Sequence, residues 1–146
     1  MFTRRTTLAL IASAVALPAR AATPEIFTTN GVAINGYDPV SYFIDGWPIE
    51  GTPRHSLDWK GAIWHFATAQ NRNDFADHPE HYAPQFGGYC AFAASKGAIA
   101  PTVPEAWTVY NYRLYLNANL RARELWLLDV PGNIALAEGF WPEILG

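Results

Sequence analysis

Alternation of apolar and polar positions predicts two β-hairpins in this chain. Trp64 and Phe66 share one face of a short segment, and the preceding Lys60-Gly61 suits a tight turn from an earlier strand. A second pair of strands is expected on either side of Asn111-Tyr112. The predicted strands cover residues 55–59, 62–66, 107–110 and 113–116, with a weaker candidate at 32–34.

Helix signals occupy most of the remaining chain. Thr68 and Asn119 can each accept a hydrogen bond from a free N–H group at a helix start. Asp38 can do the same before Pro39, whose fixed backbone angle suits a first helical turn. The predicted helical segments are a short turn over 40–43 and residues 69–77, 79–82, 89–95, 120–128 and 134–140.

Short helices around a small antiparallel sheet of two hairpins define a single-domain α+β fold. We expect residues 22–34 to form an amino-terminal lead-in, loosely held over 22–30, and residues 35–146 to form the domain. All six tryptophans lie after residue 22, and such aromatic density can build a core without disulfides.

The first 21 residues have the pattern of an export signal. Arg4-Arg5 precedes an apolar run over residues 8–17, and Ala19 and Ala21 supply a small-residue cleavage site before Ala22. The run is about half the length that a bilayer span requires. Paired arginines favour twin-arginine export to the periplasm, with an ordinary secretory signal as the alternative.

Removing the signal changes the charge of the chain. Without Arg4, Arg5 and Arg20, seven basic residues face thirteen acidic ones, a formal charge of −6. This balance disfavours nucleic acid and anionic membranes as partners, because both require clustered Lys and Arg. No later segment is long and apolar enough to span a membrane.

Cys90 is the only cysteine. A single cysteine in an exported chain points to a free reactive thiol, a metal ligand or an intermolecular link. Gly87-Gly88 precedes it and allows a sharp bend, and a helix start at Cys90 would favour the thiolate. The alternative is a buried small side chain packed among alanines, which is common for free cysteine.

Four stretches together resemble the YHS domain family, in its exported YHS domain-containing (seleno)protein branch. They are residues 35–43 (NGYDPVSYF), 63–68 with Asn71 and Arg72 (IWHFAT), 75–91 (through PEHYAPQFGGYCA) and 114–117 (LYLN). The resemblance implies a small α+β fold related to treble-clef-like metal-binding modules. It also implies a soft, nucleophilic group at Cys90, because some members carry selenocysteine there. Many YHS modules have further cysteines where this chain has Ser41 and Ala67, so a multi-cysteine metal site is not carried over.

Other candidate residues surround these motifs. Asp38 is a helix cap that would also orient a ligand if it reached Cys90, and Gln85 lies in the loop before the thiol. Tyr42 and Tyr89 are core or rim aromatics that are also candidates to line a pocket. The four histidines, His55, His65, His78 and His81, lack zinc-site spacing and are expected at the surface, with His65 facing away from the core.

Three functions follow from these residues. The first is a non-enzymatic periplasmic protein that binds a soft metal ion or a small thiophilic ligand through Cys90. Copper(I) is the best candidate ion, and a metal site with one sulfur needs a second ligand or a protein dimer. The second is a thiol peroxidase-like enzyme in which Cys90 cycles through sulfenic acid. The third is an interaction module in which Cys90 belongs to the core and an aromatic-rich surface binds a protein partner.

Overall fold

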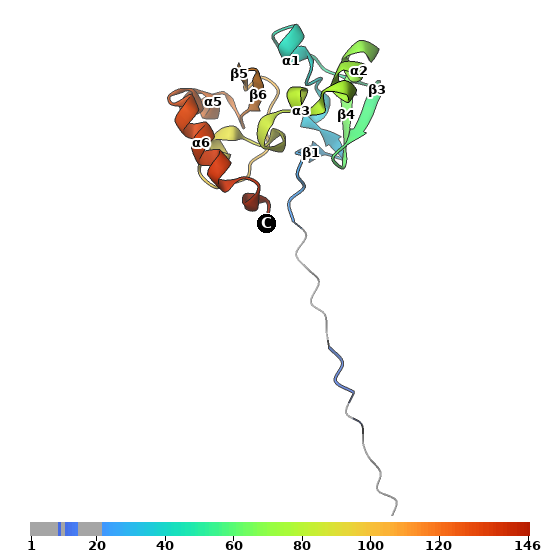
Figure 1. Ribbon diagram of the computed structural model, residues 1–146, viewed down its shortest axis with the longest axis vertical. Helices are drawn as coiled ribbons and strands as arrows, with labels where there is room; N and C mark the ends of the chain where they lie inside the picture. The colour runs from blue at the N-terminus through green and yellow to red at the C-terminus, as the bar shows by residue number, and fades with distance from the viewer. Residues whose placement is uncertain (1–8, 10, 15–21) are drawn as a thin grey trace, which may run out of the picture.

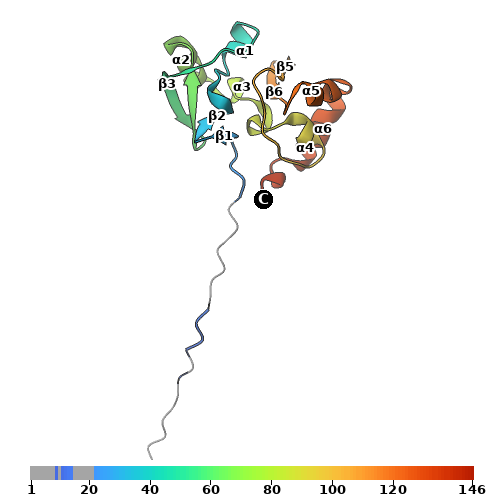
Figure 2. The same ribbon diagram turned by 180° about the vertical axis from the view of Figure 1, so that it is seen from behind.

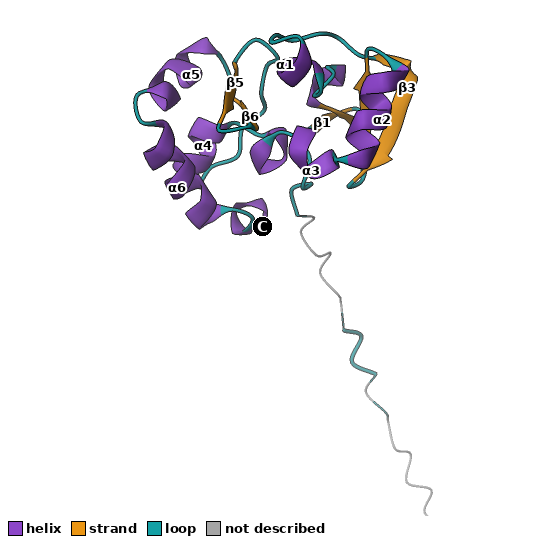
Figure 3. Cartoon of the chain, turned by 45° about the horizontal axis from the view of Figure 1, so that its top comes forward, coloured by secondary structure: helices purple, strands orange, loops and turns teal. Residues whose placement is uncertain are grey.

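The computed structural model describes residues 9, 11–14 and 22–146, so the predicted signal segment 1–21 lies largely outside the described residues. The predicted α+β fold is confirmed (Figure 1). A sheet with one covering helix forms one half, and helices with a small hairpin form the other (Figure 3). Across the described part of the chain, no helix has both the length and the apolar character needed to cross a membrane.

The larger sheet has four strands in the order β1-β2-β4-β3. Their bounds are Thr28–Thr29 (β1), Val32–Ala33 (β2), Thr52–Trp59 (β3) and Ala62–Phe66 (β4). The β3–β4 hairpin is antiparallel as predicted, and β3 begins three residues earlier than expected. β2 pairs with β4 in parallel, so the sheet is mixed rather than wholly antiparallel.

Residues 22–30, predicted to be loosely held, belong to the fold. They contain β1 and the buried Ile26. The weak strand candidate at 32–34 supplies β2, and Ala33 and Ile34 are buried in the core. Figure 2 shows β1 and β2 on the side of the sheet that faces the helical half. Short-range pattern could not predict this, because the segment is fixed by contacts with residues far along the chain.

The second hairpin joins the two halves of the molecule. It consists of β5 (Trp107–Tyr110) and β6 (Arg113–Leu116), with the bounds that the sequence predicted. Leu114 and Leu116 pack into the core beneath the four-stranded sheet, whereas Tyr115 packs into a second core among the helices. Alternating side chains of one strand point to opposite faces, so β6 contributes to both cores.

Six short helices complete the described fold. They are α1 (Ser41–Ile44), α2 (Ala69–Asp77), α3 (Pro79–Tyr82), α4 (Ala91–Ser95), α5 (Leu120–Leu127) and α6 (Val130–Phe140), with single turns at Ile34–Gly36, Gln85–Gly88 and Glu143–Leu145. The predicted caps at Thr68 and Asn119 are confirmed, since their side chains accept from the N–H groups of Asn71 and Ala122.

Three helix starts differ from the predictions. α1 begins at Ser41 rather than Val40. α6 begins at Val130 rather than Ile134, because Asp129 accepts the N–H of Gly132 and a proline in the first turn is tolerated. α4 begins at Ala91 rather than Tyr89, so Cys90 is the residue that caps it.

Candidate functional site

Cys90 follows a tightly wound loop. Phe86, Gly87 and Gly88 have φ of +55°, +64° and +83°, in the left-handed region that favours glycine. A side chain on Gly87 would overlap the carbonyl of Glu25, so this glycine also permits a close approach of two backbones. The loop thus ends on a backbone that aims the cysteine side chain at the start of α4.

The sulfur of Cys90 is enclosed and makes hydrogen bonds only within the protein. Cys90 is 1% exposed. Its Sγ accepts the N–H of Ala93 at 3.4 Å and the N–H of Ala118 at 3.2 Å, and its S–H faces Oδ1 of Asn117 at 3.4 Å. A neutral thiol therefore uses its one proton and accepts two N–H groups at the same time.

Asn117 is the residue that completes this arrangement. It is fully buried, directly follows β6, and its Oδ1 also accepts the N–H of Phe92 at 2.9 Å. Its Nδ2 has no hydrogen-bond partner among the described residues. Asn117 and Cys90 therefore join the start of α4 to the end of β6.

The groups around Cys90 do not form a ligand set for a copper(I) ion held by one chain. Copper(I) selects thiolate and thioether ligands, with imidazole as a further donor. The groups on this sulfur are backbone N–H groups and an amide oxygen. Within residues 22–146 and the few described before them, no group of three or more His, Cys, Asp and Glu side chains could hold a metal ion.

The Asp38 carboxylate accepts three hydrogen bonds, none of them from Cys90. Its Oδ1 accepts the N–H of Val40 at 2.8 Å and so closes a turn before α1. The predicted helix cap is wrong, because α1 begins at Ser41, with Val40 in the cap position and no side-chain cap bond. Its Oδ2 accepts the N–H of Ala67 at 2.9 Å and the Nδ2 of Asn71 at 2.8 Å. Cys90 is not among these partners, so the carboxylate does not orient a ligand on the thiol.

The two candidate tyrosines act as buried anchors. Tyr42 donates its hydroxyl to the carbonyl of Pro104 at 3.1 Å, and Tyr89 donates to the carbonyl of Pro24 at 2.7 Å. Burial raises the pKa of both phenols, and for Tyr42 the nearby charge of Glu105 raises the pKa further. Each tyrosine fixes a loop to the body of the domain.

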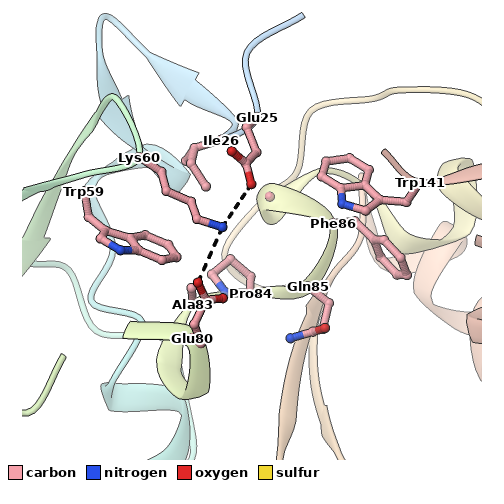
Figure 4. Close-up of a pocket in the computed structure, with 11 residues that line it drawn as sticks. Glu25, Ile26, Trp59, Lys60, Glu80, Ala83, Pro84, Gln85, Phe86 and Trp141 are labelled. Carbon is pink, nitrogen blue, oxygen red and sulfur yellow. Dashed lines mark hydrogen bonds and ion pairs between the residues drawn. The ribbon is translucent and has the colours of Figure 1, made fainter. Parts of the chain in front are cut away.

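Gln85 lines a small hollow of about 130 Å³ (Figure 4). On one side Lys60 Nζ lies 2.9 Å from a Glu25 oxygen and 3.5 Å from a Glu80 oxygen, beside the ring of Trp59. Phe86 and Trp141 stand on the opposite side in Figure 4. The hydrogen bond to Glu25 is the main cause that raises the pKa of Lys60. Because both acids already pair with Lys60, this hollow offers little unused charge for a ligand.

The five predicted ligand-binding residues therefore do not surround one cavity. Asp38, Tyr42, Tyr89 and Cys90 line none of the hollows described here, and Gln85 lines only the one beside Lys60. Asn117 was not predicted from the sequence as the partner of the thiol. The one available signal was a polar residue directly after the apolar strand 114–116.

Two further hollows, of about 360 Å³ and 530 Å³, share Thr29 and Asn35 in their linings. His65 lines the smaller hollow, consistent with its predicted direction away from the core. Ala118 lines the larger hollow, and its N–H is one of the donors to Cys90 Sγ.

The histidines do not gather into a site. His55 and His65 are half-buried, whereas His78 and His81 are exposed. The His81 ring lies tilted against Phe43 and edge-on to Tyr82, with ring centroids 5.1 Å and 4.7 Å apart. These ring contacts pack His81 on the surface of the domain.

The described residues form a single α+β domain with one enclosed thiol. Comparison with known proteins adds no relative to this description: no protein-family model, curated protein or solved structure matches the chain.

Proposed function

We propose that this is an exported, YHS-like, non-catalytic binding module in which Cys90 is a structural group. The enclosed sulfur is the observation that carries the proposal. A nucleophile or metal ligand needs access to its partner, and Cys90 is 1% exposed with all of its hydrogen-bonding capacity used inside the protein. Export rests on the signal pattern around Arg4-Arg5.

The role of Cys90 in this proposal is to join two elements. Its sulfur takes the place of an oxygen cap on α4, and it also accepts the N–H of Ala118 beyond β6. Attack on peroxide or binding of copper(I) would require this hydrogen-bonded arrangement to open first. Both hypotheses stay predictions, and the experiment that tests the proposal also tests them.

The experiment measures the reactivity of the thiol in the periplasmic form, whose amino-terminal sequence we expect to begin at Ala22. With Cys90 enclosed, reaction with a disulfide reagent such as Ellman's reagent proceeds only through opening of the fold. We expect a rate at least about a thousandfold below that of the denatured protein. The matched control is Ser56→Cys in a Cys90→Ser background, which puts the only thiol on exposed β3 and should react without delay.

Anaerobic copper(I) titration completes the test. We expect equal copper(I) affinity for the natural protein and for Cys90→Ser. A native thiol that reacts as fast as the control at position 56, or a copper affinity that disappears in Cys90→Ser, would overturn the structural role. Fast loss of the thiol with peroxide would instead support the redox enzyme.

A further inference from the structure

A hollow of about 280 Å³ is lined by the β5–β6 hairpin and by α6. Its hairpin wall includes Arg113 and Tyr115, which are two positions apart on β6 and therefore share one face of the strand. Its helix wall includes Pro131, Ile134 and Glu138, whose spacing of three and four residues places them on one face of α6. We call this cavity the α6 hollow, and two regular elements hold its walls.

Tyr115 brings an unused hydroxyl to the α6 hollow. Tyr115 is 3% exposed, and its ring packs against Trp126 with ring centroids 5.0 Å apart. Tyr42 and Tyr89 donate their hydroxyls to backbone carbonyls, whereas no hydrogen bond within the described part of the chain involves the hydroxyl of Tyr115. In that same part, the fully enclosed side-chain atoms without a partner are Asn117 Nδ2 and Trp126 Nε1. The Tyr115 hydroxyl is therefore open to the hollow that Tyr115 lines, where a ligand can pair with it.

Two opposite charges also line the α6 hollow, Arg113 on β6 and Glu138 on α6. Both residues are exposed, and neither takes part in an ion pair within the residues that the structure describes. Both charges act on the phenol between the two walls. Burial is the main cause that raises the pKa of Tyr115, the Arg113 charge lowers this pKa, and the Glu138 charge raises it. A cation and an anion that do not pair with each other can each bind an opposite charge on one ligand.

The remaining helix wall of the α6 hollow is apolar, because Pro131, Ile134 and Ala135 carry no polar side-chain group. With one cation and one anion in the lining, a ligand of single charge would leave one of the two unpaired. A ligand with both a carboxylate and an ammonium group pairs with both. The volume lies just below the range of about 300–1,000 Å³ that is usual for drug-sized ligands, so the ligand must be small.

We propose that the α6 hollow binds a small zwitterion with an apolar side chain, either a free α-amino acid or a dipeptide. The Arg113 guanidinium pairs with the ligand carboxylate, and the Tyr115 hydroxyl donates to the same group. The Glu138 carboxylate pairs with the ligand ammonium group, and the apolar side chain contacts Ile134 and Ala135. This inference rests on the proposed function as a binding module and names its ligand by chemistry.

The probe is L-leucine, and isothermal titration calorimetry measures its binding to the periplasmic form. Leucine amide lacks the carboxylate, and N-acetylleucine lacks the ammonium group. We expect each to bind about fivefold more weakly than leucine, because each loses one charge pair. The dipeptide Gly-Leu is titrated beside leucine, and the tighter of the two identifies the source of the zwitterion.

Variants of the lining assign each ligand group to its partner. Arg113→Gln and Glu138→Gln should each lower the affinity for leucine about fivefold. In Arg113→Gln, leucine and leucine amide should bind about equally, and in Glu138→Gln the same should hold for leucine and N-acetylleucine, because the partner of the missing group is already absent. Tyr115→Phe keeps the ring in the core and should lower the affinity about fivefold through the lost hydrogen bond.

Matched controls separate this site from the general effect of charge. Arg121→Gln and Glu124→Gln each remove the same charge from an exposed ion pair on α5, and neither residue lines the α6 hollow. Both control variants should bind leucine with unchanged affinity.

Three outcomes would overturn the inference: no measurable binding of leucine or Gly-Leu, equal losses in the lining and control variants, or a cost of amidation in Arg113→Gln as large as in the natural protein. None of these outcomes depends on the reactivity of Cys90. A reactive thiol with a working α6 hollow would overturn the proposed structural role alone. An enclosed thiol with no zwitterion binding would overturn the α6 hollow alone.

Discussion

At the scale of single residues, the buried carboxylate of Asp38 holds three segments together. Its two oxygens accept three hydrogen bonds, from the turn before α1, from the end of β4 and from α2. Asp38 is fully buried, and its bonds with Val40 and Asn71 are buried too, so these two donors lose their partner if the carboxylate is removed. A buried donor without a partner costs about 1–3 kcal/mol.

Replacing Asp38 should therefore destabilise the protein strongly. We expect Asp38→Ala and Asp38→Asn each to lower the free energy of unfolding by about 2–4 kcal/mol, since alanine leaves donors unpaired and asparagine points an NH₂ group at a donor. Urea denaturation monitored by tryptophan fluorescence measures the change. Exposed Asp58→Asn is the control and should stay within about 0.5 kcal/mol. Similar losses for Asp38→Asn and Asp58→Asn would contradict this role.

A residue's contacts could be predicted only where its partners lie close in the sequence. Asp38 was predicted as a helix cap from its neighbour Pro39, but its local bond closes a turn to Val40, one residue before α1 begins. Its bonds to Ala67 and Asn71 cross 29 and 33 positions, and no local pattern encodes them. The same holds for the thiol, whose partner Asn117 lies 27 positions away.

At the scale of elements, local chemistry predicted most starts and stops. Capping side chains and turn residues act within four positions, so both predicted hairpins and the helices that follow Thr68 and Asn119 were identified. Long-range pairing was not predictable. The parallel contact of β2 with β4 and the packing of residues 23–27 against the 85–89 loop depend on the whole fold.

Gly87 is the element-scale position where this packing is most sensitive. Gly87→Ala combines a positive φ with an overlap against the Glu25 carbonyl, whereas Gly31→Ala has a positive φ and no atom within 4 Å of the new carbon. We expect a loss of about 1 kcal/mol for Gly31→Ala and about 2–4 kcal/mol for Gly87→Ala. Chemical denaturation of the pair measures the difference. Equal losses would show that residues 23–27 can leave the loop at little cost.

At the scale of the whole molecule, two hydrophobic cores share one strand. Leu114 and Leu116 of β6 face the core under the sheet, and Tyr115 faces the core that contains Trp126 and Phe86. Cys90 and Asn117 join α4 to the end of this same strand. The sheet half and the helical half should therefore unfold together, and buried tyrosines in both halves should report the same transition.

Alkaline pH tests this coupling. Burial raises the pKa of Tyr42, Tyr89 and Tyr115 in the folded state, whereas unfolded tyrosine titrates at about pH 10. Above that pH the unfolded chain releases phenol protons that the folded chain retains, so the contribution to stability is complete below about pH 10 and falls as pH rises. Lys60, whose pKa is also raised, adds to the fall with the same sign.

We expect the free energy of unfolding to decline above about pH 10, with each retained proton adding about 1.4 kcal/mol per pH unit to the slope. Tyr42→Phe removes one such proton together with the hydrogen bond to Pro104. It should lower stability at pH 8 by about 1 kcal/mol and make the alkaline slope shallower by one proton. Denaturant titrations between pH 8 and pH 12, with tyrosinate absorbance as a second readout, measure both effects.

An unchanged slope in Tyr42→Phe would mean that Tyr42 ionises in the folded protein as readily as in the unfolded chain. Separate transitions for tyrosinate absorbance and tryptophan fluorescence would show that the two cores unfold independently.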